Sequence, residues 1–150
     1  MKTLLPLAAA VLLACAAVHA TVRIDGTGPF YPTIQDAVTA AYDGAIIRVS
    51  TGVYSETVDI IGTNLALHGG YDMACTQHLS YLDTVIHGAG GAADLVDISN
   101  AVVELSGLRL FYGGNGIDIR DGGLTSRYCW IHGNCATFGG GVFANDSHLV

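Results

Sequence analysis

Positive charge is scarce in this chain. Only six of the 150 residues are lysine or arginine, against 13 Asp and Glu. The one lysine, Lys2, stands at the N-terminus, so beyond that segment the chain carries its positive charge on five arginines alone. Nucleic-acid backbones and anionic lipid surfaces are bound by cationic patches, which a chain this acidic lacks. We therefore expect no nucleic-acid partner.

Long apolar runs and simple glycine repeats are also missing. No segment beyond residue 20 has the roughly 20 consecutive apolar residues that a transmembrane helix requires, so no transmembrane span is expected. The 20 glycines follow no G-x-y period, which excludes collagen. At 51% hydrophobic residues, the composition is too apolar for intrinsic disorder. The length fits one globular domain.

The N-terminal segment predicts export. Met1–Thr3 is a short positively charged start, Leu4–Val18 is almost wholly apolar, and Val18–Ala20 fits a signal-peptidase site. Residues 1–20 are therefore predicted to be a cleaved signal peptide, residues 21–150 the folded domain, and the destination secreted, periplasmic or outer-membrane associated. An alternative cut exists, because Leu12–Cys15 is similar to a bacterial lipobox with Cys15 as the lipidated N-terminus.

Short motifs of alternating apolar and polar residues recur along the domain. The first is Val58–Ile60, and it returns at residues 96–98, 117–119 and 142–144, 21 to 25 residues apart except across the Gly69–Tyr81 insertion. A turn-forming residue follows each copy: Gly62, Asn100, Asp121 and Asp146. A second apolar column comprises Leu65, Val103, Leu124 and Leu149. A third pairs Ile47/Val49, Thr84/Ile86, Leu108/Leu110 and Cys129/Ile131.

This pattern predicts an all-β fold, a right-handed parallel β-helix with three strands per coil. One helix is expected before it, with Thr33 as N-cap and Gly44 as the C-terminal stop, and with an apolar stripe of Ile34, Ala37, Val38 and Ala41. Such a helix caps the open end of a solenoid core. At the other end, Leu149–Val150 falls in the second column of an unfinished coil. We therefore expect an incomplete C-terminus, or one that pairs with a further chain.

Three segments resemble the N-terminal part of pectin-lyase-like β-helix proteins: Tyr31–Ala37, Ile46–Val49 and Gly52–Glu56. Gly139–Ala144 is similar to the repeats of polymorphic outer-membrane and adhesin-like β-helix proteins. The resemblance implies an exported scaffold that contacts glycans or cell surfaces without catalysis. It also implies an alternative, a polysaccharide lyase, esterase or hydrolase acting on acidic polysaccharide.

The candidate site residues are acids on the predicted outer face. Asp59, Asp97 and Asp118 occupy one outward column, with Asp94 and Asp121 nearby. For a lyase, Asp59, Asp97 and Asp118 would bind Ca²⁺, with Arg120 or Arg127 as the base. For a hydrolase, two carboxylates such as Asp97, Asp118 or Asp121 would act as acid and base. The other interpretation is a solvated face that keeps the sheet from aggregating.

The histidines and cysteines suggest no metal centre. His68, His87 and His132 stand at strand ends on different coils, without the close spacing of a zinc site. Export permits disulfides, so Cys75–Cys135 and Cys129–Cys135 are both conceivable pairs. Because Cys129 is equivalent to the inward Leu108, a buried thiol is also expected there. No organic cofactor is expected.

Overall fold

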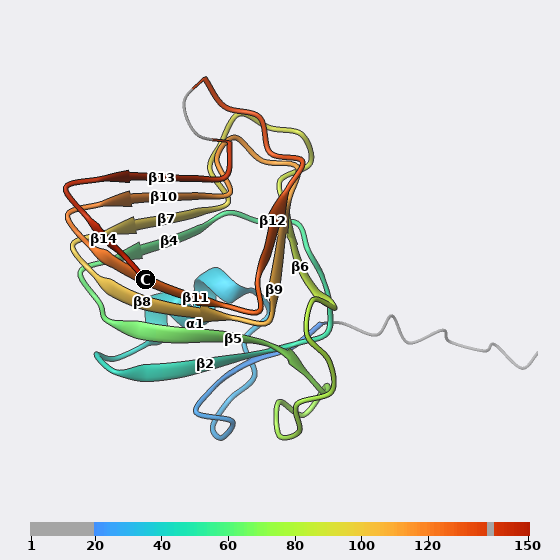
Figure 1. The fold of residues 1–150 in the computed structure, drawn as a ribbon. Helices are drawn as coiled ribbons and strands as arrows, with labels where there is room; N and C mark the ends of the chain where they lie inside the picture. Colours follow the sequence, from blue (N-terminus) through green and yellow to red (C-terminus); the bar gives the residue numbers. More distant parts are fainter. Residues whose placement is uncertain (1–19, 138–139) are drawn as a thin grey trace, which may run out of the picture.

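The chain winds into a parallel β-solenoid of about four turns, bounded by three sheets (Figure 1). The computed structural model describes residues 20–137 and 140–150. Each turn contributes one strand to each sheet, and all strand-to-strand pairings are parallel except the antiparallel pairing of β1 with β2. Two isolated bridges, Val22–Tyr31 and Tyr71–His78, are also antiparallel. The predicted parallel three-sheet solenoid is confirmed.

The sheets are here numbered in the order in which one coil visits them. Sheet 1 contains β1 (Val22–Ile24), β2 (Ala45–Ser50), β5 (Leu65–Tyr71), β8 (Val102–Ser106), β11 (Gly123–Arg127) and β14 (His148–Leu149). Sheet 2 contains β3 (Gly52–Tyr54), β6 (Thr84–His87), β9 (Leu108–Phe111) and β12 (Trp130–His132). Sheet 3 contains β4 (Val58–Ile61), β7 (Val96–Ser99), β10 (Ile117–Arg120) and β13 (Val142–Asn145).

Two of the three predicted columns stack in register. Val58 pairs with Val96, Ile117 with Val96, and Ile117 with Val142, so the first motif forms one row across sheet 3. Leu65, Val103, Leu124 and Leu149 form a row across sheet 1. The residues that follow the first motif have the left-handed backbone expected of turns, with φ of 52° at Asn100 and 51° at Asp121.

The predicted third column is wrong at its first coil. Ile47 lies on β2 in sheet 1, opposite Leu67, and is not part of sheet 2. The partners of Thr84 and Ile86 are instead Gly52 and Tyr54 on β3. The error has a physical reason: the β2 and β3 segments both alternate apolar residues, and only one residue separates them, so periodicity alone does not show where the chain turns the corner.

The interior is apolar and formed by the predicted inward residues. Val58, Ile60 and Leu67 are fully buried, and Leu65 nearly so, whereas Asp59 between them is exposed. The alternation of buried and exposed residues along β4 therefore follows the strand period of two. Stacked on neighbouring coils, these side chains make one continuous core.

Helix α1 (Ile34–Ala40) lies across the first coils. Thr33 is its N-cap, and its hydroxyl accepts a 3.0 Å hydrogen bond from the Asp36 backbone N–H, as predicted. Ile34, Ala37 and Val38 are buried on its inner face. The predicted stop at Gly44 is wrong, because the helix ends at Ala40 with an extended C-cap at Ala41; Gly44, with φ of 87°, belongs to the turn into β2.

Several sequence-based predictions concern residues outside the described ranges. The signal peptide, apart from Ala20, and the lipobox cysteine Cys15 lie there. Among the described residues, no helix is long and apolar enough to cross a membrane. At the C-terminal end, β14 pairs with β11 and places Leu149 beside Leu124.

The three cysteines of the domain are free thiols. Neither predicted pairing, Cys75–Cys135 or Cys129–Cys135, is formed. Cys75 is buried beside Thr21, and burial is the main cause that raises the pKa of its thiol. Cys129 packs against the core but is only partly buried, so the buried thiol predicted from its equivalence with Leu108 is wrong; Cys135 is exposed on another loop. Spacing in sequence did not reveal these separate locations.

Candidate functional site

The predicted acidic column is present on the outer face of sheet 3. Asp59 pairs in register with Asp97, and Asp97 with Asp118, so the three carboxylates occupy one row across β4, β7 and β10. Their surroundings differ: Asp59 is exposed and Asp97 is half-buried, whereas Asp118 is only 4% exposed. The interpretation of a uniformly solvated face therefore does not hold at Asp118.

Arg120 forms ion pairs with two of the three acids in this row, Asp97 and Asp118. Its guanidinium forms an ion pair of 3.3 Å with Asp97 Oδ2 and a second ion pair with Asp118 Oδ2. Asp97 and Asp118 together raise the pKa of Arg120, which favours its protonated form. A guanidinium held in this way is a poor proton acceptor, and this counts against Arg120 as the base of a lyase.

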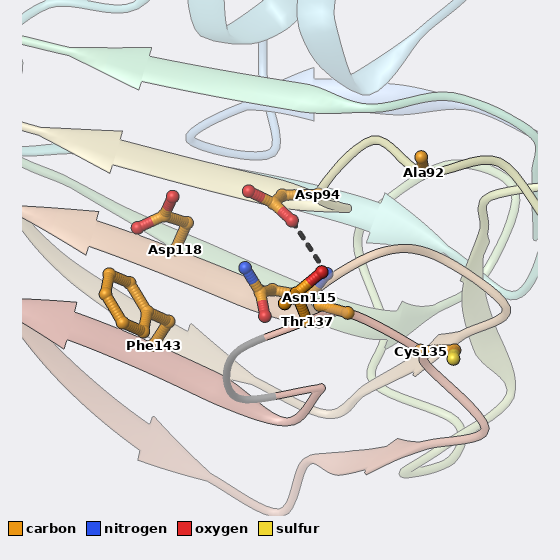
Figure 2. A pocket seen from close by; sticks show the side chains of 8 residues that line it. Ala92, Asp94, Asn115, Asp118, Cys135, Thr137 and Phe143 are labelled. Atoms are coloured by element: carbon orange, nitrogen blue, oxygen red, sulfur yellow. Dashed lines mark hydrogen bonds between the residues drawn. The ribbon is translucent and has the colours of Figure 1, made fainter.

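A hollow of about 350 Å³ lies beside Asp118 and is called here the Asp118 pocket. Figure 2 shows Asp94, Asp118 and Phe143, which come from three successive coils, arranged around it. Asp94 accepts a 2.7 Å hydrogen bond from the Asn115 backbone N–H, which ties the segment before β7 to the segment before β10. The wall of the Asp118 pocket also includes Asn115, Cys135 and Thr137.

Asp118 carries an unsatisfied polar atom. Its Oδ1 is buried and has no hydrogen-bond partner, while Oδ2 is bonded to Arg120. Burial raises the pKa of Asp118, Asp97 and Asp94 raise it further, and Arg120 opposes them. The carboxyl proton of Asp118 is therefore held more tightly in the folded state than in the unfolded state. The stability that this proton contributes is fully present below the ordinary pKa of an aspartate, and it is lost as the pH rises through the raised pKa of the folded state.

The remaining candidate residues lie apart from this pocket. Asp121 is exposed in the turn from sheet 3 to sheet 1, where it lines a shallow hollow with Asp146 and His148. Arg127 is exposed at the end of β11. Within residues 20–137 and 140–150, no group of three or more His, Cys, Asp or Glu side chains is placed to hold a metal ion.

A second surface feature, which the sequence reasoning missed, lies on the outer face of sheet 2. Five side chains of β6, β9, β12 and the turn after β9 make a continuous row of rings, called here the aromatic strip. The strip consists of His87, Phe111, Tyr112, His132 and Trp130. Trp130 and Tyr112 are both about half exposed.

The solenoid register produces the strip. His87 pairs with Phe111, and Phe111 with His132, so that the three rings stack in one column. The Phe111 and His132 centroids are 4.7 Å apart, and those of Trp130 and His132 are 4.3 Å apart, with the planes within about 30°. Tyr112 lies parallel to His87 at 5.6 Å. The other two contacts, His87–Phe111 and Phe111–Tyr112, are tilted by 55° and 58°.

Two buried polar atoms without partners lie in the strip or beside it. Arg109 is the register partner of Trp130 on β9, and its Nε is buried without a hydrogen bond. His132 Nε2 is likewise buried and unpaired. Buried donors and acceptors that lack partners cost free energy.

A signal for the strip was present in the repeats. Ile86–Gly88 and Ile131–Gly133 are both Ile-His-Gly, and Leu110–Tyr112 occupies the same coil position. Because Ile86, Leu110 and Ile131 form one inward row, the residue after each had to stack on the outer face. Treating each histidine separately hid this alignment. His68 does lie elsewhere, on sheet 1, where its Nε2 is 3.3 Å from Glu104.

Comparison with known proteins gives no relative to set beside this geometry. Neither the protein-family models, nor the curated proteins, nor the solved structures include one that matches the chain.

Proposed function

We propose that the protein is an exported β-solenoid scaffold that binds glycans on the aromatic strip and does not transform them. The single observation that carries the proposal is the continuous row of contacting rings on sheet 2, exposed at Trp130 and Tyr112. Sugar rings have an apolar C–H face that packs on aromatic side chains, and hydroxyl edges that need hydrogen-bond partners. The strip supplies the rings, and Arg109 and His132 supply nitrogen atoms at its base.

The shape of the strip favours a chain-like ligand. Its rings come from three successive coils, and neighbouring strands in a sheet lie about 4.8 Å apart. Three strands therefore give a footprint of about 10 Å, the length of roughly two sugar units, along a rigid surface. A preformed surface binds with little loss of conformational freedom. These features suit an adhesin-like or glycan-contacting role in the cell envelope or outside the cell.

Replacing Trp130 with Ala should weaken oligosaccharide binding by about tenfold or more, because Trp130 offers the largest exposed ring of the strip. The measurement is isothermal titration with hexasaccharides of glucose, N-acetylglucosamine, glucosamine and galacturonate. The matched control is Phe30→Ala, which removes an equally exposed ring from the N-terminal loop and should leave binding unchanged. Equal affinity of Trp130→Ala and the wild type for every hexasaccharide bound would contradict the proposal.

A turnover assay distinguishes the scaffold proposal from the alternative, a carbohydrate-active enzyme. Acidic polysaccharides are incubated with the protein with and without calcium, and the same is done with Asp97→Ala and Asp118→Ala. The scaffold proposal expects binding without product in every case. Product formation that both substitutions abolish would instead establish a carbohydrate-active enzyme that uses the acidic row.

A further inference from the structure

We infer that the Asp118 pocket is a binding site for a primary amine, presented by an amino sugar. The inference that the ligand is an amine depends on the pocket alone. The choice of a sugar as carrier rests on the proposed function. The pocket lies outside the aromatic strip, so the two sites can be tested separately.

Charge is the first argument. Asp94 and Asp118 line the pocket, and Asp97 is the register neighbour of Asp118. Arg120 is the one cation that forms ion pairs with this group among the described residues. One guanidinium against three carboxylates leaves an excess of negative charge, which a protonated amine would offset.

The unsatisfied oxygen is the second, independent argument. Asp118 is more than nine-tenths buried, and its Oδ1 has no hydrogen-bond donor. A lone acceptor of this kind is costly unless a donor reaches it. An ammonium group carries three N–H donors in a small volume and can bond to more than one carboxylate oxygen at once. Asp94, whose described hydrogen bond uses only Oδ1, is the second acceptor in the same pocket.

The remaining wall fits an organic amine better than a metal ion. Phe143 stands on the pocket wall, as Figure 2 shows, and the face of a phenyl ring attracts organic cations. Calcium would require six to eight oxygen ligands, and the described residues contain no cluster of three or more potential metal-binding side chains. The volume of about 350 Å³ is at the lower end of the range for small-molecule sites and suits one sugar ring.

The pocket is also connected with the strip. A second hollow, at the corner between sheets 2 and 3, shares Ala92 and Cys135 with the Asp118 pocket and extends to Tyr112. A polymer that lies on the aromatic strip could therefore pass round this corner and place a substituent beside Asp118. A glycan with free amines would use both surfaces.

The test compares two sugars that differ at one group. Glucosamine and N-acetylglucosamine are titrated at pH 7 into the ¹⁵N-labelled protein while backbone amide shifts are followed. Glucosamine should shift the amides of Asp94, Asn115 and Asp118, with an affinity about tenfold or more above that of N-acetylglucosamine, which lacks the charge. Binding of glucosamine should weaken as the pH falls. Asp118 faces Asp94, Asp97 and Arg120 and has a raised pKa, so it takes up a proton and loses its charge at a higher pH than an ordinary aspartate does.

Two variants make the result specific. Asp118→Asn keeps the shape and an oxygen for Arg120 but removes the charge, so the preference for glucosamine should disappear while the protein stays folded. Asp59→Asn removes an exposed acid of the same row that lies outside the pocket, and the preference should persist. Equal shifts with both sugars, a preference unchanged in Asp118→Asn, or displacement of glucosamine by equimolar calcium would overturn the inference.

The outcome is distinguishable from that of the proposed function. Trp130→Ala should weaken oligosaccharide binding by about tenfold or more and retain the preference for glucosamine in the pocket. If the preference is absent while hexasaccharides still bind through Trp130, the pocket inference fails alone. If the preference is present while no hexasaccharide responds to Trp130→Ala, the proposed function fails alone.

Discussion

Leu110→Ala should lower the free energy of unfolding by about 2–5 kcal/mol. Leu110 is fully buried at the centre of β9, and its register partners Ile86 and Ile131 stack on either side of it. Truncation removes the transfer free energy of the lost atoms and leaves a cavity that stacked coils cannot close without moving whole strands. Urea unfolding followed by circular dichroism measures the loss.

The matched control for Leu110→Ala lies on the same sheet. Val53 also belongs to a strand of sheet 2, β3, but its side chain faces outward and is 65% exposed. Val53→Ala should change the free energy of unfolding by no more than about 0.5 kcal/mol. A loss at Leu110 as small as the loss at Val53 would mean that the β9 register is wrong.

Gly70→Ala should destabilise the protein by about 2–5 kcal/mol, the sum of backbone strain and steric overlap. Gly70 has φ of 83°, and a Cβ there would lie 1.7 Å from the Ser80 carbonyl oxygen. That oxygen belongs to the backbone of the insertion, which is itself hydrogen-bonded to Gly70 O through the Leu79 and Ser80 N–H groups. The loop must therefore open before the methyl group fits.

Gly62→Ala separates these two contributions. Gly62 has a similar φ of 66°, but a Cβ there would meet no atom within 4 Å. This variant should lose only the left-handed backbone cost of about 1–2 kcal/mol. Thermal unfolding of both variants gives the comparison, and a Gly70→Ala protein as stable as Gly62→Ala would show that the insertion does not fold back on β5 as described.

The repeats made most of the fold predictable. Rows such as Leu65, Val103, Leu124 and Leu149 could be aligned because inward side chains of a parallel solenoid must stack on their equivalents in the next coil. Prediction failed where two strands follow each other with almost no turn between them. There, alternation continues through the corner, and Ile47 was placed on the wrong sheet.

The candidate sites were less predictable because they depend on neighbours from other coils. The row of Asp59, Asp97 and Asp118 followed from alternation, but the burial of Asp118 did not. Asp118 pairs in register with Phe143, and Thr137 lines the same pocket, so its neighbours come from later in the chain. The aromatic strip needed His87, Phe111 and His132 to be compared as one column rather than as residues at separate strand ends.

The most direct test of glycan binding uses the intrinsic fluorescence of the strip. Trp130 is the only tryptophan in the chain, so its emission reports on this surface alone. Titration with the four hexasaccharides should give a saturable change in Trp130 emission for at least one of them, because a sugar ring packed on the indole displaces water from its exposed half. Emission that remains unchanged with all four hexasaccharides would contradict a glycan-binding role for the aromatic strip.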